Sequence, residues 1–431
     1  MIDPTPTSPP TTSLPTTGVT IRSIHVEVVR GPDAGKELTA TSERVVIGTH
    51  RTADLVLTDR SVSRFHIELM IDSECVVLRD LGSRNGTLLD GVGLVHGRLR
   101  GPTIVQAGES ELRIDVQGEA IPLTLAPQEQ FGALIGASAV MRLAFERLEQ
   151  AALRDGHILI EGERGTGKDV AAAALHERSG RRDGPLDVID CAAPALEVEA
   201  LLLGRGDRSG ALERCHRGTL VLDDVGSLPR GTQRALVRAL EDKAVRRRDT
   251  IAPADVRVIA LSRKNLRIDV NADRFAPELF ELLAGTRVRL PPLRERHEDV
   301  PLLVDHFLAT LDAASSRAGV QLMSPESLDQ LRGSAWPGNV RELRAYVEQS
   351  VLADGAPIGE DAEPPLVDTS TTMRDARQRW LRYFERTYVA ELLAQTNGNV
   401  SQAAVLAGVD RVYMHRLITR CGLREALAKA R

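Results

Sequence analysis

The residues best suited to chemistry form a glycine-rich run, GERGTGKD, at positions 162–169. The run follows an apolar segment at 158–162 that predicts a β-strand, and the residues after it predict a helix. Glycines let the main chain approach an anion, successive N–H groups can wrap phosphate oxygens, and the helix N-terminus favours negative charge. Lys168 is placed to reach the β- and γ-phosphates of a nucleotide. We therefore expect this loop to bind ATP.

Four further runs accompany the loop: LIG at 134–136, GTLVLDD at 218–224, LPPLRER at 290–296 and WPGNVREL at 336–343. Over residues 131–352 the chain resembles the AAA+ domain of the sigma-54-dependent activators, whose loop reads GESGTGKE. The common P-loop pattern ends in Lys-Ser/Thr, so Asp169 fits this sub-family better. The resemblance implies that Asp223 holds Mg²⁺ through water and that Arg341 is the sensor II arginine. It implies nucleotide contacts from Gly136, Gly162, Glu163, Gly165, Thr166, Gly167, Lys168, Asp169 and Arg341.

Several positions depart from that family where ATP hydrolysis needs them. Asp224 stands at the catalytic carboxylate position, where the family has the longer Glu, and a misplacement of about 1 Å can cost on the order of a hundredfold. ALSR at 260–263 replaces the family's AATN, which carries the sensor I asparagine. Both arginine-finger positions hold neutral residues, Ala276 and Leu282. Because a missing finger costs roughly 10³–10⁵ in rate in related NTPases, we expect ATP binding with very slow or no hydrolysis.

The loop with which the family contacts sigma-54 polymerase is missing from the sequence. The family carries GAFTGA between the two nucleotide motifs, whereas residues 203–212 read LGRGDRSGAL and lead almost directly to the next strand. We therefore expect no direct remodelling of sigma-54 polymerase, with RNA polymerase remaining a candidate partner. The alternative is an active ATPase that remodels sigma-54 RNA polymerase at enhancer-controlled promoters.

A second set of polar residues lies nearer the N-terminus, in SVSRFH at 61–66 and DLGSRNGT at 80–87. Together with Ile47-Gly48 and DLVL at 54–57, these motifs resemble a forkhead-associated (FHA) domain. That family folds as a β-sandwich and binds phosphothreonine peptides through loops at one end. The partner implied is a phosphothreonine-containing protein or the chain's own Thr-rich tail, and a sandwich used only for protein contact is the alternative.

Phosphopeptide contacts are expected from Ser63, Arg64 and Asn85. A hydroxyl and a guanidinium can hold phosphate oxygens, and the asparagine can bond the peptide backbone. His66 is expected to brace the loop and not to touch the ligand. The family usually has an arginine directly after the glycine of position 48; Thr49 replaces it here, and Arg51 is the candidate substitute.

The C-terminal segment carries the pattern of a DNA-binding module. NGNVSQAAVLAGV at 397–409 predicts a helix with Ser401 as its cap, then a glycine turn, and a second helix is predicted at 410–421. The pattern resembles the Fis-type helix-turn-helix that ends sigma-54 activators, whose second helix enters the major groove of double-stranded DNA. Contacts with DNA are expected from Arg411, Tyr413, Met414, His415, Arg416 and Arg420.

Charge and apolar pattern support this assignment. Between 373 and 431 eleven Lys and Arg stand against five Asp and Glu, a local net charge of +6 on a chain whose net charge is −5. An apolar stripe precedes the motif and, in this family, implies a helix that pairs two subunits, so we expect at least a homodimer; its members are Leu381, Phe384, Tyr388 and Leu392. A helical interaction domain that no longer recognises DNA is the alternative.

These motifs need elements that hold them in place. Short β-branched runs broken by turn residues predict an all-β sandwich over 21–117. Apolar strands alternating with helices over 131–300 predict a parallel sheet wrapped by helices, followed by a helical lid at 301–354. The Thr- and Pro-rich residues 1–20 are expected to be disordered, 355–372 to form a linker, and 373–425 the helix-turn-helix domain. The expected fold is multidomain: an all-β FHA sandwich, an α/β P-loop AAA+ domain with its α-helical lid, and an all-α helix-turn-helix.

Composition excludes other classes. No apolar run approaches the roughly 20 residues needed to span a bilayer and the N-terminus lacks a signal-peptide pattern, so we expect a cytoplasmic protein without a membrane partner. The four cysteines lie far apart and lack metal-ligand spacing, which favours free thiols.

Overall fold

The structure of the chain is a computed structural model. It describes residues 20–40, 44–72, 75–122, 125–206, 208–246, 251–314, 316–354, 380, 384–385, 387–393, 396, 399–409, 414 and 417–418. The chain divides into two compact units, Met1–Asp354 and Gly355–Arg431, which are described separately. Within the described residues, none of the helices has both the length and the apolar character needed to cross a membrane.

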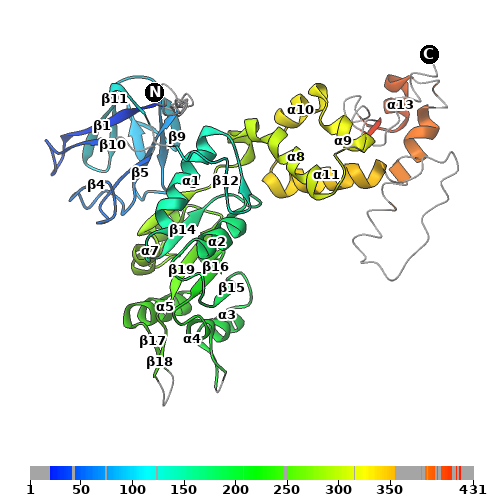
Figure 1. Ribbon diagram of the computed structural model, residues 1–431. Helices are drawn as coiled ribbons and strands as arrows, with labels where there is room; N and C mark the ends of the chain where they lie inside the picture. Colours follow the sequence, from blue (N-terminus) through cyan, green and yellow to red (C-terminus); the bar gives the residue numbers. More distant parts are fainter. Residues whose placement is uncertain are drawn as a thin grey trace, which may run out of the picture. The chain divides into compact units, whose positions relative to one another are not determined.

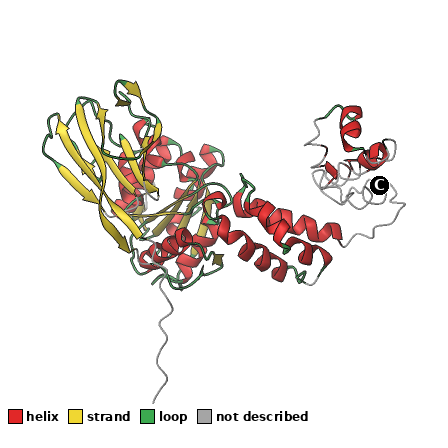
Figure 2. Cartoon of the chain, turned by 90° about the horizontal axis from the view of Figure 1, so that it is seen from above, coloured by secondary structure: helices red, strands yellow, loops and turns green. Residues whose placement is uncertain are grey.

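The N-terminal part is a β-sandwich, as predicted. Figure 2 draws it as strands and loops, and the first helix of the chain comes after the sandwich strands in sequence. One sheet has the strand order β2-β1-β11-β10-β7-β8 and the other β4-β3-β5-β6-β9. Alternate side chains of β1, such as Ile24, Val26 and Val28, are fully buried between the sheets. The strands are β1 Thr20–Arg30, β2 Glu37–Ala40, β3 Arg44–Gly48, β4 Leu55–Val56, β5 Ile67–Asp72, β6 Cys75–Asp80, β7 Thr87–Leu89, β8 Val92–Gly93, β9 His96–Leu99, β10 Thr103–Ala107 and β11 Ser110–Pro122.

The central part is an α/β domain around a parallel sheet, which also confirms the predicted fold class (Figure 1). The strand order is β15-β16-β19-β14-β20. Its strands are β14 Ile158–Glu161, β15 Leu186–Asp190, β16 Thr219–Asp223, β19 Arg257–Ser262 and β20 Thr286–Arg289. The helices that connect them are α1 Ala139–Ala152, α2 Lys168–Glu177, α3 Ala195–Leu203, α4 Ala211–Arg214, α5 Arg230–Asp242, α6 Leu266–Asn271 and α7 Pro277–Leu283. Two short antiparallel pairs are β12 Gln130–Phe131 with β13 Leu134–Ile135, and β17 Ala244–Arg246 with β18 Ile251–Pro253.

The two faces of the parallel sheet bury different helices. Because side chains alternate along a strand, Ile158 and Ile160 of β14 join the cluster formed with α1 and α2, whereas Leu159 joins that formed with α5, α6 and α7. The second cluster also contains four apolar residues of the N-terminal sandwich: Val46, Ala53, Phe65 and Leu81. The sandwich therefore shares a hydrophobic core with one face of the α/β domain.

A helical segment follows the sheet and completes the first unit. Its elements are the short 3-10 turns η2 Leu293–Glu295 and η3 His297–Asp299, then α8 Val300–Thr310, α9 Arg317–Leu322, α10 Pro325–Arg332 and α11 Asn339–Asp354. These helices pack around a separate apolar cluster that includes Val304, Trp336 and Leu343, as a helical lid requires.

In the second unit most of the described residues are helical, and α13 spans Val400–Leu406. Asn399 caps this helix, because its side chain accepts a hydrogen bond from the N–H of Gln402 at 3.2 Å. The prediction that Ser401 is the cap was wrong: Ser401 lies one residue inside the helix, and the asparagine two positions earlier has the extended backbone that a cap requires. The predicted linker 355–372 and most of the second helix at 410–421 lie outside the described residues.

Candidate functional site

The glycine-rich run forms a loop between β14 and α2, at the carboxyl edge of the parallel sheet (Figure 1). Gly165 and Gly167 have φ of +80° and +98°, backbone conformations that favour glycine. A Cβ on Gly165 would lie 2.2 Å from the carbonyl oxygen of Gly338. The loop is thus held in a shape that side chains would prevent, and it leads directly into the first turn of α2.

Lys168 begins α2 and is buried. Its Nζ donates to the carbonyl oxygens of Gly162 at 2.8 Å and Glu163 at 2.7 Å, so the ammonium lies within the loop. Burial lowers the pKa of this ammonium, while the nearby carboxylates of Asp223 and Asp169 oppose that shift. The like charges of Arg263 and Arg341 also lower this pKa. Such a concentration of positive charge is suited to an anion.

The other predicted nucleotide residues gather around the same loop. The Glu163 carboxylate accepts two hydrogen bonds from Arg294, at 2.7 and 2.6 Å, and this pairing lowers its pKa. The N–H of Arg341 donates to Gly165 O at 3.3 Å, which ties the helical lid to the loop. Thr166 Oγ1 donates to Glu163 O, Asp169 is exposed, and Gly136 is buried beside the Asp299 carboxylate.

Asp224, at the predicted catalytic position, has φ of +54° in the left-handed region. Its Oδ2 accepts a hydrogen bond from Ser227 Oγ at 2.8 Å, and its Oδ1 lies 3.8 Å from Arg263 Nε. Arg263 ends the segment that replaces the family's sensor I asparagine. The carboxylate expected to orient an attacking water is therefore paired with a cation, and Asp223 beside it ends β16.

The two positions at which the family carries arginine fingers, Ala276 and Leu282, pack against the α/β domain. Ala276 is buried before the first turn of α7, and its N–H donates to Gln233 Oε1 at 2.7 Å. Leu282 is partly buried against the core of the same face. Neither position presents a cation to a neighbouring subunit. Between β15 and β16 the described residues form only α3, a short bridge between Arg205 and Arg208, and α4.

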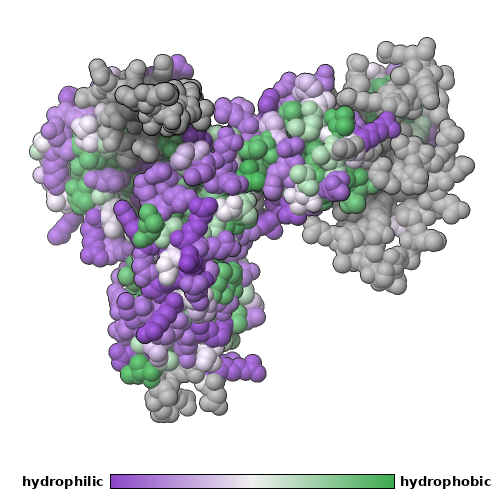
Figure 3. Space-filling model, viewed as in Figure 1, coloured by the Kyte–Doolittle hydropathy of each residue, from purple (hydrophilic) through white to green (hydrophobic). Residues whose placement is uncertain are grey.

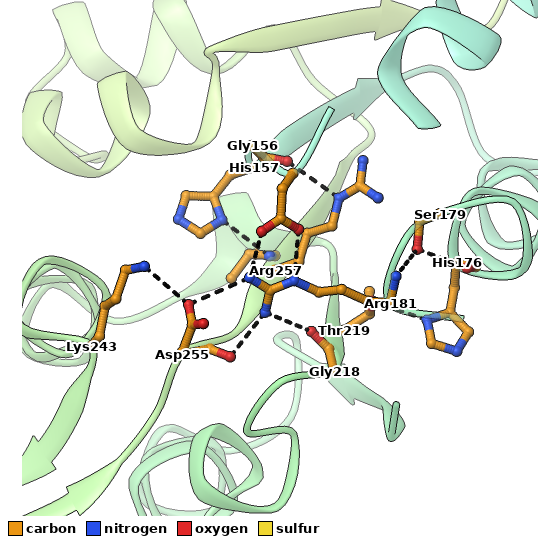
Figure 4. A network of polar contacts seen from close by, with 12 residues as sticks. Gly156, His157, His176, Ser179, Arg181, Gly218, Thr219, Lys243, Asp255 and Arg257 are labelled. Atoms are coloured by element: carbon orange, nitrogen blue, oxygen red, sulfur yellow. Dashed lines mark hydrogen bonds and ion pairs between the residues drawn. The ribbon is translucent and has the colours of Figure 1, made fainter. Parts of the chain in front are cut away.

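The opposite edge of the sheet carries a polar network with no predicted role in binding (Figure 4). Arg257, fully buried at the start of β19, donates from Nη2 to Ala151 O at 2.6 Å. Arg181 forms ion pairs with Asp155 at 2.6 Å and Asp255 at 3.4 Å. His176 bonds Thr219 Oγ1 at 2.9 Å. These contacts join the strand beginnings to the surrounding loops, so we assign them to the fold.

The FHA-type motifs meet at one end of the sandwich. Ser63 Oγ accepts a hydrogen bond from the N–H of Arg84 at 2.9 Å, and Asn85 Nδ2 donates to Ser61 O at 2.8 Å. His66 braces these loops, as predicted: its Nδ1 accepts from the N–H of Ser63 at 3.1 Å and its Nε2 lies 3.1 Å from Gly86 O. Burial lowers the pKa of His66, which keeps the ring neutral for these two bonds.

The two predicted phosphate-binding arginines contact the α/β domain instead of facing away from it. Arg64 Nη2 donates to Asp273 Oδ1 at 2.6 Å and to Asn271 O at 3.3 Å. Arg51 forms an ion pair with Glu281 of α7. Sequence reasoning missed these acceptors, because residues about 210 and 230 positions apart carry no local signal of contact.

One predicted DNA-contacting residue lies elsewhere. Met414 is fully buried among Val389, Leu392, Ala403 and Leu417, so the prediction that it reaches base edges was wrong. Its side chain packs against the first helix of the motif, which an apolar side chain favours over a groove lined with water. The other five predicted contacts, Arg411, Tyr413, His415, Arg416 and Arg420, lie outside the described residues.

Comparison with known proteins supports the central assignment. The family model described as the sigma-54 interaction domain matches residues 134–289, and an AAA+ ATPase lid domain model matches 294–378. Residues 27–118 match a model described as the cytoplasmic domain of an inner membrane component of the type III secretion system. Among solved structures, NtrX from Brucella abortus in complex with ATP is 30% identical, with a TM-score of 0.47, over 68% of this chain and 70% of that chain. The FHA domain of CT664 from Chlamydia trachomatis is 27% identical, with a TM-score of 0.21, over 22% of this chain and 99% of that chain.

Curated relatives match about two thirds or more of the chain. The transcriptional regulatory protein ZraR of Klebsiella oxytoca is 35% identical over 67% of this chain and 69% of its own length. The C4-dicarboxylate transport transcriptional regulatory protein DctD of Pseudomonas aeruginosa is 33% identical over 72% of this chain and 69% of its own length. With its FHA-like sandwich, AAA+ core and lid, this chain belongs to the family of sigma-54-dependent transcriptional regulators.

Proposed function

We propose that this regulator binds ATP without turning it over at an appreciable rate, and that it binds DNA through its C-terminal helices and phosphothreonine peptides through its FHA-like sandwich. The proposal rests on a contrast between the residues suited to binding phosphates and the residues at the positions that hydrolysis requires. The glycine loop and Lys168 are shaped to hold phosphates, whereas Asp224 is paired with Arg263 and both finger positions hold neutral residues, Ala276 buried and Leu282 partly buried.

The loop geometry supports nucleotide binding. Lys168 Nζ rests on two carbonyl oxygens of the loop, and a triphosphate would offer it charged oxygens in their place. Arg263 and Arg341 add positive charge near the same ammonium. The Asp223 carboxylate, at the end of β16, fits a role in holding Mg²⁺ through water, since that ion keeps several waters and takes few carboxylates. The bound ion would neutralise phosphate charge.

Slow hydrolysis follows from what surrounds the phosphates. An attacking water needs a carboxylate free to accept its hydrogen bond, and Asp224 already accepts from Ser227 and faces Arg263. Phosphoryl transfer also needs a cation at the developing charge, which in related NTPases contributes roughly 10³–10⁵ in rate. Ala276 and Leu282 cannot supply that cation. ATP occupancy, rather than turnover, would then set the state of the protein.

Nucleotide affinity measured beside phosphate release tests this proposal. We expect a fluorescent ATP analogue to bind the full chain with Mg²⁺, and Lys168→Ala to weaken that binding roughly 10- to 150-fold, since a hydrogen bond to a charged group contributes about 1.5–3 kcal/mol. The exposed Lys264→Ala provides a matched control. Magnesium-dependent phosphate release that rises with protein concentration would contradict the proposal and favour the alternative, an active ATPase that remodels sigma-54 polymerase.

DNA binding by the C-terminal unit and phosphopeptide binding by the sandwich are proposed on separate grounds. The C-terminal unit has a capped helix, α13, over a small apolar core, and a basic segment with net charge +6 surrounds it in sequence. Phe384 and Tyr388 stack with ring centroids 5.5 Å apart and are exposed, which suits a helix that pairs two subunits. The sandwich loops present Ser63, Arg84 and Asn85 at one end, where a phosphorylated partner would bind. The division into domains at 21–117, 131–300, 301–354 and 373–425 is part of the same proposal.

A further inference from the structure

The phosphate-binding end of the FHA-like sandwich already holds anions, and they belong to the same chain. Arg64 donates to the Asp273 carboxylate, in the segment between α6 and α7, and Arg51 pairs with Glu281 on α7. His50 adds a third contact, with its Nε2 3.2 Å from Glu281 Oε1. Both cations expected to meet a phosphate therefore meet carboxylates instead.

The segment that carries Asp273 is held at the loops by hydrogen bonds to the loop main chain. Asn271, the last residue of α6, accepts from the N–H of Phe65 at 3.1 Å and donates from Nδ2 to the carbonyl oxygens of Phe65 and Leu81. One asparagine side chain thus bonds both loops that carry the FHA-type motifs. Asp273 follows two residues later with φ of +53°, in the left-handed region.

Buried groups anchor the same interface. The Phe65 ring is fully buried, with its centroid 5.2 Å from that of Phe280, and the guanidinium carbon of Arg267 lies 5.3 Å from the Phe65 centroid. Beside it, Arg44 and Glu68 of the sandwich form a buried charged cluster with Glu161, Arg267 and Arg287 of the α/β domain. These contacts are costly to separate, because they expose apolar surface and leave charges without partners.

The Arg64–Asp273 and Arg51–Glu281 ion pairs are more exposed than the buried Phe65 ring. In the first pair Asp273 is 66% and Arg64 30% exposed, and in the second Arg51 is 79% and Glu281 18% exposed, so each pair has one side chain open to solvent and to a ligand. Exposed ion pairs contribute only about 0.2–1 kcal/mol each. A phosphate group, with up to two negative charges and three acceptor oxygens, offers the guanidinium more than one carboxylate does.

We infer that Asp273 and Glu281 are internal ligands of the FHA-like loops, and that a phosphothreonine peptide must displace them from Arg64 and Arg51 while the Phe65 anchor stays packed. This inference rests on the proposed phosphopeptide binding. It makes the α6–α7 segment the element that a phosphorylated partner acts on. That segment also holds the two former finger positions, so the peptide would act on the part of the AAA+ domain that relatives use toward a neighbouring subunit.

Removing the internal carboxylates tests the inference with the full chain. The probe is a degenerate nonapeptide pool with a central phosphothreonine, compared with the same pool carrying threonine, and binding is followed by fluorescence anisotropy. Asp273→Asn suits the site because Asn tolerates the left-handed backbone, and Glu281→Gln keeps the side-chain volume. The matched control is Glu278→Gln, an exposed carboxylate of the same helix.

We expect each variant to bind the phosphothreonine pool about 1.5- to 5-fold more tightly than wild type, the double variant to show the combined gain, and the control to match wild type. Because misfolding lowers affinity, a gain cannot come from a damaged fold. Phosphate-specific binding that is equal in all variants would overturn the inference and leave phosphopeptide recognition standing. Equal binding of the two pools by every variant would overturn both.

Discussion

Phe65 offers the sharpest test of whether the FHA-like sandwich is built into the AAA+ core. Its ring is fully buried at the junction, with its centroid 4.7 Å from that of His50 in a tilted contact and 5.2 Å from that of Phe280 in an edge-to-face contact. It belongs to the same apolar cluster as residues of α5, α6 and α7. Phe65→Ala would leave a cavity at this junction and remove the aromatic contact between the two parts.

The size of the effect follows from burial. Truncating a buried phenylalanine to alanine costs roughly 3–5 kcal/mol. Unfolding entropy near 60 °C is about 2.1 cal/mol/K per residue, so the roughly 330 residues of 20–354 give about 0.7 kcal/mol/K. Dividing the first quantity by the second gives an expected fall in Tm of about 4–7 °C for the transition of the first unit.

Differential scanning calorimetry of the full chain measures this change. Leu69→Ala, inside the sandwich core, is the control: it should destabilise the sandwich while leaving the junction with the α/β domain intact. We expect Phe65→Ala alone to separate the unfolding of the sandwich from that of the α/β domain. A fall of less than 1 °C, or a sandwich that unfolds independently in the wild-type chain, would refute the shared core and with it the anchor on which the displacement of Asp273 depends.

Two further predictions concern pH and helix capping. Burial holds the pKa of His66 below its ordinary value of 6.5, so the unfolded chain is protonated before the folded chain as the pH falls. The free energy of unfolding should therefore keep the full contribution of this group above pH 6.5. Below pH 6.5 it should decrease, by at most about 1.4 kcal/mol per pH unit for this group. Thermal unfolding between pH 7.5 and 5.5 checks this, and His66→Gln should flatten the profile. Asn399→Ala should lower the free energy of unfolding of the C-terminal unit by about 1 kcal/mol, whereas Ser401→Ala should change that free energy by about a few tenths of a kcal/mol. Thermal unfolding followed by near-UV circular dichroism compares the two variants. A larger effect of Ser401→Ala would identify Ser401 as the cap.

Local patterns predicted the fold and the phosphate loop well. The spacing of glycines and Lys168 depends on backbone conformation within eight residues, and the strand and helix patterns on either side are equally local. The same is true of His66, whose bracing role follows from its place three residues after Ser63. Where a prediction depended on one loop and its flanking elements, the structure has the predicted strand, loop and helix.

Contacts between distant segments were beyond such reasoning. Nothing in the residues around Arg64 indicates that its partner is Asp273, and nothing around Arg263 indicates that it faces Asp224 across neighbouring strands. Met414 failed for a related reason, because its position in the motif predicted a groove contact while its apolar side chain packs against the preceding helix. Ser401 was chosen over Asn399 although both residue types cap helices, and only the backbone conformation distinguishes them.

The buried charged cluster has a consequence for how this architecture can change. Glu161, the residue directly before the glycine loop, lies 3.6 Å from Arg44 of the sandwich, and Arg44 in turn lies 3.1 Å from Glu68. Burial alone raises the pKa of Glu161, but Arg287 and Arg44 outweigh it and hold the pKa below its ordinary value. A foreign sensory module spliced in front of this AAA+ core would remove Arg44 and Glu68, which leaves Glu161 to Arg287 and takes the Glu68 carboxylate away from Arg267. Exchanging the sandwich for another module would therefore require new counter-charges at this junction, so the two parts are not freely interchangeable.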